Sequence, residues 1–227
     1  MEEKSEKTAY ALAIKQVPIK ESCPLPIPEE ILQQSALWTF DHREAIQKET
    51  VPMSVFFVLL TGKAKIIQTQ ENGKRALLQF LHPGDCIGDL TLIGAETVPK
   101  TVVAIGETTC LGIPMQAAAH GLMQDLAFVQ TLGKTIGEKL LLRMDHFSVN
   151  QTYPLAWRLA HLLLEASIDD LFQEKLTETA EYLGVSYRHL TYTLKDFKTQ
   201  KLVTKTADGY RIDAPALQTF IQNQQKQ

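Results

Sequence analysis

The spacing of hydrophobic positions differs between segments of the 227-residue chain. From about residue 36 to 114, apolar and β-prone residues form short runs that are separated by turn signals. Asn72-Gly73 is typical of a tight hairpin and Pro83-Gly84-Asp85 of a turn. Short runs at this spacing predict a small antiparallel barrel or sandwich. The expected strands are 55–61, 63–70, 75–81, 101–105 and 110–113.

The spacing becomes helical between residues 116 and 150, where apolar residues recur every three or four positions. This pattern is close to a heptad seam, so it predicts one long helix with two apolar stripes. One stripe can pack on the barrel and the other on a second copy of the chain; the alternative is a helix buried wholly within its own chain. The residues of the pattern are Leu122, Leu126, Val129, Gly133, Ile136, Leu140, Met144 and Phe147.

A helix, a short turn and a second helix are predicted from residue 176 onward. Thr177 is placed to cap the first helix, Gly184 to end it in a left-handed conformation, and Ser186 to cap the second helix. Inward positions at helical spacing follow at Leu190, Leu194 and Phe197. This is the construction of a helix-turn-helix that reads DNA; the alternative is an ordinary packed helical hairpin.

The second helix of this unit presents a polar, donor-rich face. Two short β-prone runs, 202–205 and 210–213, then surround Asp208-Gly209 and predict a hairpin, or wing, that can touch flanking phosphates. The candidate DNA-contacting residues are Thr177, Ser186, Tyr187, Arg188, His189, Thr191, Tyr192 and Lys195.

Charge supports this interpretation locally. The whole chain carries a net charge of −3, whereas residues 186–211 hold six Lys or Arg against two Asp, a balance of +4. A basic face on an acidic protein is typical of a site-specific reader, in which phosphate contacts fix the register and a few side chains read bases.

Composition limits the class of protein. No apolar run reaches the roughly 18 residues that a membrane span needs, and the charged start, Met-Glu-Glu-Lys, lacks a secretory apolar core. Three cysteines are too few for a disulfide scaffold. We therefore expect a cytoplasmic α+β protein with a polar arm (1–28), a β-barrel sensor (29–115), a dimerisation helix (116–150) and a winged helix-turn-helix domain (151–227).

This order of domains resembles the CRP/FNR superfamily of bacterial transcription regulators, in particular its YeiL-like branch. The runs that carry the resemblance are 57–63, Asn72-Gly73-Lys74, 83–90 and 183–190. The resemblance implies a homodimer with a cyclic-nucleotide-binding-type jelly roll, which senses a signal and re-aims two recognition helices on double-stranded DNA. It also allows RNA polymerase as a partner.

By position, Ser186, Tyr187, Arg188 and Tyr192 match the DNA-contacting residues of the family. Arg188 is the best candidate for reading a base, because its guanidinium fork suits guanine O6 and N7.

The resemblance also places a candidate effector pocket. Family members that bind cyclic AMP present Gly-Glu-Leu followed by Arg-Ser or Arg-Thr; this chain has Gly88-Asp89-Leu90 and Lys100-Thr101, with Arg143 where an adenine contact is expected. The shorter carboxylate, and a lysine that cannot clamp phosphate in a bidentate way, argue against cyclic AMP. An unidentified small ligand in the barrel is the leading expectation for the signal.

Three cysteines cannot supply the four ligands of the family's iron–sulfur cluster within one subunit. A disulfide from Cys23 to Cys110 or Cys86 is the thiol-redox alternative, against three reduced cysteines that act as small apolar residues. No metal site is expected.

Enzymatic activity is not expected, because the barrel region has only His42 and His82 and no His-x-His pair. The remaining alternative of another class is a nucleotide-binding regulatory subunit, which leaves the winged unit unexplained.

Overall fold

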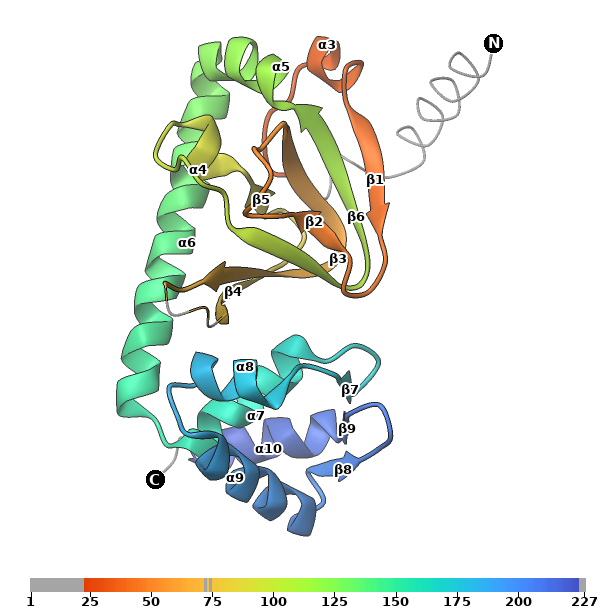
Figure 1. The fold of residues 1–227 in the computed structure, drawn as a ribbon, viewed down its shortest axis with the longest axis vertical. Helices are drawn as coiled ribbons and strands as arrows, with labels where there is room; N and C mark the ends of the chain where they lie inside the picture. Colours follow the sequence, from red (N-terminus) through yellow and green to blue (C-terminus); the bar gives the residue numbers. More distant parts are fainter. Residues whose placement is uncertain (1–22, 72, 74, 225–227) are drawn as a thin grey trace. The chain divides into compact units, whose positions relative to one another are not determined.

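The structure is a computed structural model that describes residues 23–71, 73 and 75–224 (Figure 1). It divides into two compact units, Met1–Gln68 with Gln79–Leu141, and Thr69–Leu78 with Leu142–Gln227. Of the predicted polar arm, residues 1–22 lie outside the described part. Within the described residues, every helix is too short or too polar to cross a lipid bilayer.

A six-stranded sheet forms the first unit, in the order β1-β6-β3-β4, with β2 paired to β6 and β5 paired to β3. The pairings of β6 with β1, β2 and β3 are antiparallel, as is that of β3 with β5. This confirms the predicted antiparallel β domain. The strands are β1 (Ala36–Phe40), β2 (Ala45–Gln47), β3 (Val55–Thr69), β4 (Arg75–Leu81), β5 (Cys86–Ile87) and β6 (Thr101–Pro114).

The prediction of separate strands on either side of Gly62 was wrong, because β3 runs through it without a break. Gly62 has φ +83°, and the register with β6 shifts on both sides of Thr61, so the glycine makes a bulge. A Cβ at this position would lie 2.4 Å from the carbonyl oxygen of Glu107. The strand predictions at 101–105 and 110–113 likewise merge into β6, which passes through Gly106 at φ +73°.

Strands β1 and β2 were not among the runs predicted from the sequence. In β1, both Trp38 and Thr39 are exposed and only Phe40 is buried, so the strand lacks the alternation that marks a half-buried strand. Its register is set by β6, with Trp38 opposite Cys110.

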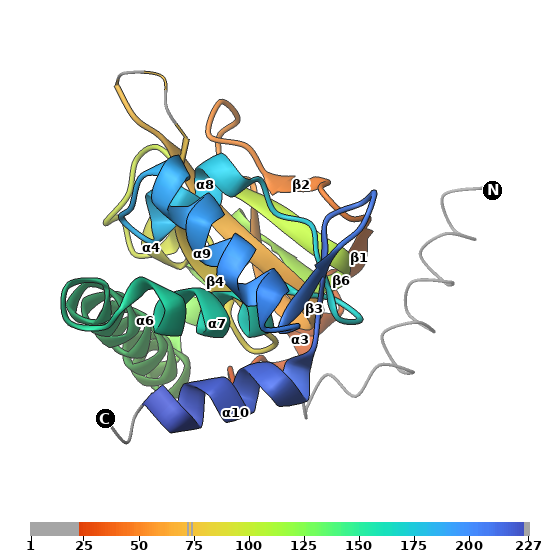
Figure 2. The ribbon, with the colours of Figure 1, turned by 90° about the horizontal axis from the view of Figure 1, so that it is seen from below.

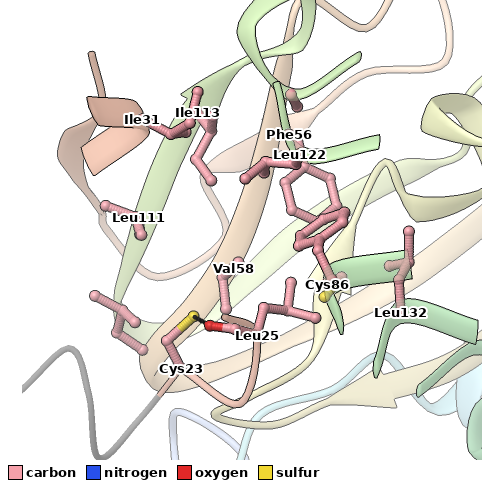
Figure 3. Close-up of a cluster of buried hydrophobic side chains, with 13 residues drawn as sticks. Cys23, Leu25, Ile31, Phe56, Val58, Cys86, Leu111, Ile113, Leu122 and Leu132 are labelled. Carbon is pink, nitrogen blue, oxygen red and sulfur yellow. Dashed lines mark hydrogen bonds between the residues drawn. The ribbon is translucent and has the colours of Figure 1, made fainter. Parts of the chain in front are cut away.

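An apolar cluster joins the sheet to the helices of the first unit (Figure 3). Phe56 and Val58 of β3 pack in it with Phe128 and Leu132 of α6. Residues Cys23 and Leu25 also lie in this cluster, so the described end of the predicted arm packs against the sheet domain.

The prediction of one helix from residue 116 was also wrong. The structure has α5 (Met115–His120), the 3₁₀ turn η1 (Leu122–Gln124) and then α6 (Leu126–Thr152). Asp125 is extended, and its Oδ1 accepts a hydrogen bond from the backbone N–H of Phe128 at 2.9 Å, so it caps a new helix. The short helices α3 (Glu29–Leu32) and α4 (Asp89–Leu92) complete this unit.

After α6, the second unit consists of four helices and a small sheet. This arrangement confirms the winged helix-turn-helix prediction (Figure 1). The sheet has the order β7-β9-β8. Strand β7 was not predicted, because two residues are too few for a sequence pattern. The elements are α7 (Leu155–Ala166), β7 (Leu171–Phe172), α8 (Leu176–Tyr182), α9 (Tyr187–Thr199), β8 (Val203–Lys205), β9 (Tyr210–Ile212) and α10 (Ala214–Gln224).

Candidate nucleic-acid interface and sensor residues

The turn between α8 and α9 is built by local backbone chemistry. Gly184 has φ +65°, and its N–H donates to the carbonyl of Glu181 at 3.0 Å, which closes α8. Ser186 is extended, and its hydroxyl accepts from the N–H of His189 at 3.2 Å. The predicted glycine stop and serine cap are therefore confirmed.

The predicted cap at Thr177 was wrong. Helix α8 begins at Leu176, two residues before the start that a cap at Thr177 implies, with Lys175 at the N-cap position and no side-chain cap. Thr177 lies exposed in the first turn. Its exposed position is compatible with a DNA contact, which stays a prediction.

Helix α9 buries the three predicted apolar side chains, Leu190, Leu194 and Phe197, each at most 2% exposed. Its N-terminal half directs polar side chains to solvent, and in Figure 2 the helix lies in front of α7 and α8. Tyr187 and Tyr192 are 52% and 54% exposed. The other exposed candidates are Arg188, His189 and Lys195, whereas Thr191 is half-buried.

Arg188 is held against a tyrosine on the surface of α9. Its guanidinium carbon lies 5.6 Å from the ring centroid of Tyr192, one helical turn away, and Nη2 lies 3.5 Å from the tyrosine hydroxyl. This contact restricts the rotamers of Arg188, and in the described part of the chain the other donors of the fork bond no protein group. A planar fork on an exposed helix face is suited to the edge of a base pair.

The wing follows α9 directly. Strands β8 and β9 pair from Val203–Ile212 to Lys205–Tyr210, and the N–H of Thr206 donates to the carbonyl of Gly209 at 2.9 Å. The ammonium group of Lys205 lies 5.4 Å from the ring centroid of Tyr210. The exposed cations of the wing can contact phosphates, which bind without reading sequence.

The candidate effector carboxylate already has an internal partner. Asp89, the first residue of α4, is buried, and its Oδ2 lies 2.9 Å from the ammonium nitrogen of Lys139 on α6. Lys139 is also buried and donates a second hydrogen bond to the carbonyl of Cys86 at 2.5 Å. Lys139 was not among the residues predicted from the sequence, where its only signal is a charged residue inside a largely apolar helical pattern.

The other polar candidates of the first unit are similarly engaged. Lys100 is paired with Glu96 at 2.5 Å, and the hydroxyl of Thr101 accepts from the N–H of Glu49 at 3.2 Å. Gly88 has φ +92° and precedes α4, where Leu90 is half-buried. Arg143 belongs to the second unit and is exposed, and its place in an effector pocket stays a prediction.

All three cysteines are free and buried. Burial raises the pKa of the Cys110 thiol to about 12 and also raises the pKa of Cys86 and Cys23 above the usual thiol range. Cys23 and Cys86 share the apolar cluster of Figure 3, whereas Cys110 is not part of it. Buried thiols with raised pKa values react slowly, which favours the role of small apolar residues over a redox role.

Within the described residues, no three His, Cys, Asp or Glu side chains are grouped so that they could hold a metal ion.

The chain is similar to a known domain family and to known regulatory proteins. The model of the cyclic nucleotide-binding domain matches residues 37–125. The regulatory protein YeiL of Escherichia coli O157:H7 is 36% identical over 183 residues, which cover 81% of this chain and 84% of that protein. The HTH-type transcriptional regulator Cmr of Mycobacterium tuberculosis is 27% identical over 58% of this chain and 54% of its own length.

Solved structures share the fold at low sequence identity. A transcriptional regulator of the CRP/FNR family from Eubacterium rectale superposes with a TM-score of 0.71 at 16% identity, covering 90% of this chain and 98% of that one. A CRP-family transcriptional regulator from Thermus thermophilus gives a TM-score of 0.65 at 17% identity, over 82% of this chain and 96% of its own.

Proposed function

Because the chain belongs to the CRP/FNR family of transcription regulators, we propose that it acts as a homodimer that reads a two-fold symmetric operator under the control of a signal at its sheet domain. Its relatives are transcription regulators, and accordingly the chain is a DNA-binding transcription regulator and not an enzyme.

The observation that carries the proposal is the exposed face of α9. It combines Arg188, stacked on Tyr192, with the exposed Tyr187 and Lys195. A helix that offers a guanidinium fork, aromatic edges and a cation has the chemistry to read base edges and fix phosphates. The adjoining wing adds Lys205 and other cations on the flank of the same site.

Exposed apolar side chains on α6 support the homodimer. Met144 and Phe147 are 59% and 67% exposed, and Leu140, one turn earlier, is 58% exposed. Large apolar side chains at heptad spacing are costly in water and are typical of a helix that packs on a partner. A second copy of the same helix is the occupant that a two-fold symmetric operator requires.

For the signal, we propose a small ligand other than cyclic AMP. The carboxylate of Asp89 is neutralised by Lys139, and Lys100 is paired with Glu96, so the groups expected to hold a ribose hydroxyl and a phosphate are both engaged internally. The thiol switch is the weaker alternative, because all three thiols are buried. A cytoplasmic location and contact with RNA polymerase stay predictions.

The test is selection of binding sites from random duplex DNA by the full-length protein, under reducing and under oxidising conditions. We expect the same two-fold symmetric site in both. Recovery in only one condition would favour the thiol switch, and a site without two-fold symmetry would contradict the dimer. Lys134→Ala, an exposed change on α6, is the matched surface control, and Arg188→Ala is the variant that should lose the site.

A further inference from the structure

A single arginine joins the end of α6 to the turn of the helix-turn-helix. Arg158, on α7, donates from Nε to the carbonyl of Tyr153 at 2.9 Å and from Nη1 to Oδ1 of Asn150 at 2.9 Å. Nη1 also donates to the carbonyl of Leu183, at the end of α8. The guanidinium therefore contacts both sides of one junction within the second unit.

Asn150 reinforces this junction from the α6 side. Its Nδ2 donates to the carbonyl of Tyr182 at 3.0 Å, while its Oδ1 accepts from Arg158. The ring of His146, one turn earlier on α6, packs against the ring of Tyr182 with centroids 4.1 Å apart and an angle of 31° between the ring planes. Three side chains thus fix the last two turns of α6 to the end of α8.

The position of the contacts matters for α9. Leu183 is followed by Gly184, and Ser186, three residues after Leu183, caps the recognition helix. A carbonyl held at Leu183 therefore restrains the backbone that sets the direction in which α9 starts. Because the guanidinium is planar and its donors diverge in a fixed fork, the acceptors on α6 and α8 cannot move independently of each other.

We propose that Arg158 is a positioning residue, which fixes the direction of α9 relative to the end of α6 and thereby sets the half-site spacing that the dimer accepts. The proposal rests on the proposed function, because α6 is the expected dimer helix and α9 the expected reader. Half-site spacing depends on the geometry between dimer axis and recognition helix, so the residue that fixes this geometry determines spacer length.

The test measures affinity for the selected operator and for versions with the spacer lengthened or shortened by one base pair. We expect the full-length protein to prefer its own spacing by about tenfold or more, since one added or removed base pair misaligns both contacts. Arg158→Ala should weaken binding to the selected operator by about tenfold, as expected for loss of charged hydrogen bonds. The three spacings should then bind within about threefold of one another, and affinity for unrelated DNA should stay unchanged.

Conservative and matched variants separate positioning from folding. Arg158→Lys should behave like Arg158→Ala, because one ammonium group cannot hold three diverging acceptors. Asn150→Ala should lose part of the spacer preference, while Gln151→Ala, the exposed neighbouring residue, should keep it. If Arg158→Ala fails to fold, Asn150→Ala carries the test. Retained spacer preference in both variants would overturn the proposal.

Hydrogen exchange tests the positioning role of Arg158 without DNA, and so separately from the proposed DNA-reading function. The amides of Gly184 and Val185 are bonded to Glu181 and Ala180 and should exchange at least about tenfold faster in Arg158→Ala than in the parent protein. If the parent protein selects no DNA site, the proposed function fails, yet unchanged exchange at these amides would still refute the role of Arg158.

Discussion

At the scale of single residues, the polar face of α9 gives the most direct test. Arg188→Ala should reduce affinity for the operator by about 1–3 kcal/mol and relax specificity at one base pair, because it removes a bidentate donor. Lys195→Ala should instead weaken binding to all sequences and lower the slope of log affinity against log salt by about one. Affinity titrations at several salt concentrations distinguish the two variants. If both show the same change in specificity and in salt dependence, the proposal that Arg188 reads a base and Lys195 contacts a phosphate is contradicted.

The buried pair between Asp89 and Lys139 belongs to the same scale. Lys139→Met should lower the free energy of unfolding by about 3–5 kcal/mol, because it leaves a carboxylate buried without its partner. Adding Asp89→Leu to this variant should restore much of that loss, since no unpaired charge remains. Urea unfolding of Lys139→Met, of Asp89→Leu and of the double variant completes the cycle, and simple additivity of the two single changes would show that the ion pair is not coupled in the folded state.

His146 predicts a dependence of stability on pH. Burial, and to a lesser extent the charge of Arg158, lower its pKa below the usual value of 6.5. The unfolded chain then binds the proton more readily, so the contribution of this residue is present above about pH 6.5 and is lost as the pH falls toward the folded pKa. Urea unfolding between pH 8 and pH 5 should show this loss, and His146→Gln should reduce the slope.

At the scale of elements, the bulge in β3 depends on one glycine. Gly62→Ala should destabilise the protein by more than about 1 kcal/mol, because the residue has φ +83° and the added Cβ would meet the carbonyl of Glu107. Gly137→Ala is the matched control on α6, where no described residue, apart from the neighbouring backbone of the helix itself, lies within 4 Å of an added Cβ. It should stabilise the helix by about 0.5–1 kcal/mol. Thermal unfolding of both variants checks the contrast, and a harmless Gly62→Ala would show that the strand can flatten.

Between elements, the sequence was least informative at junctions. The break between α5 and α6 depends on Asp125, which caps the start of α6. An aspartate inside a helical pattern does not by itself indicate that one helix ends and another begins there. Strand β7 forms because Leu171 and Phe172 pair with residues of β9. Local propensity does not encode such a partner, so two-residue strands and helix breaks were not predicted.

At the scale of the whole molecule, the oligomeric state is the property to measure. If the proposed dimer forms through α6, Met144→Glu combined with Phe147→Glu should convert it to a monomer, because charges replace apolar side chains on the proposed contact face. Leu142→Glu is the control: Leu142 is 62% exposed but lies two residues before Met144, about 200° around the helix. Sedimentation velocity should show a dimer for the control and a monomer for the double variant. A dimer that survives in both would place the interface elsewhere.

The sequence by itself determined the elements whose contacts are local. These features involve residues a few positions apart, so local sequence patterns predict them. They are the glycine stop, the serine cap, the inward apolar positions of α9 and the Asp208-Gly209 hairpin. Only the tertiary structure decided which distant groups meet. Lys139 lies 50 residues from Asp89, and Arg158 lies 25 residues from Leu183. Such pairs form because packing brings two elements together and then leaves a buried charge or carbonyl that must find a partner.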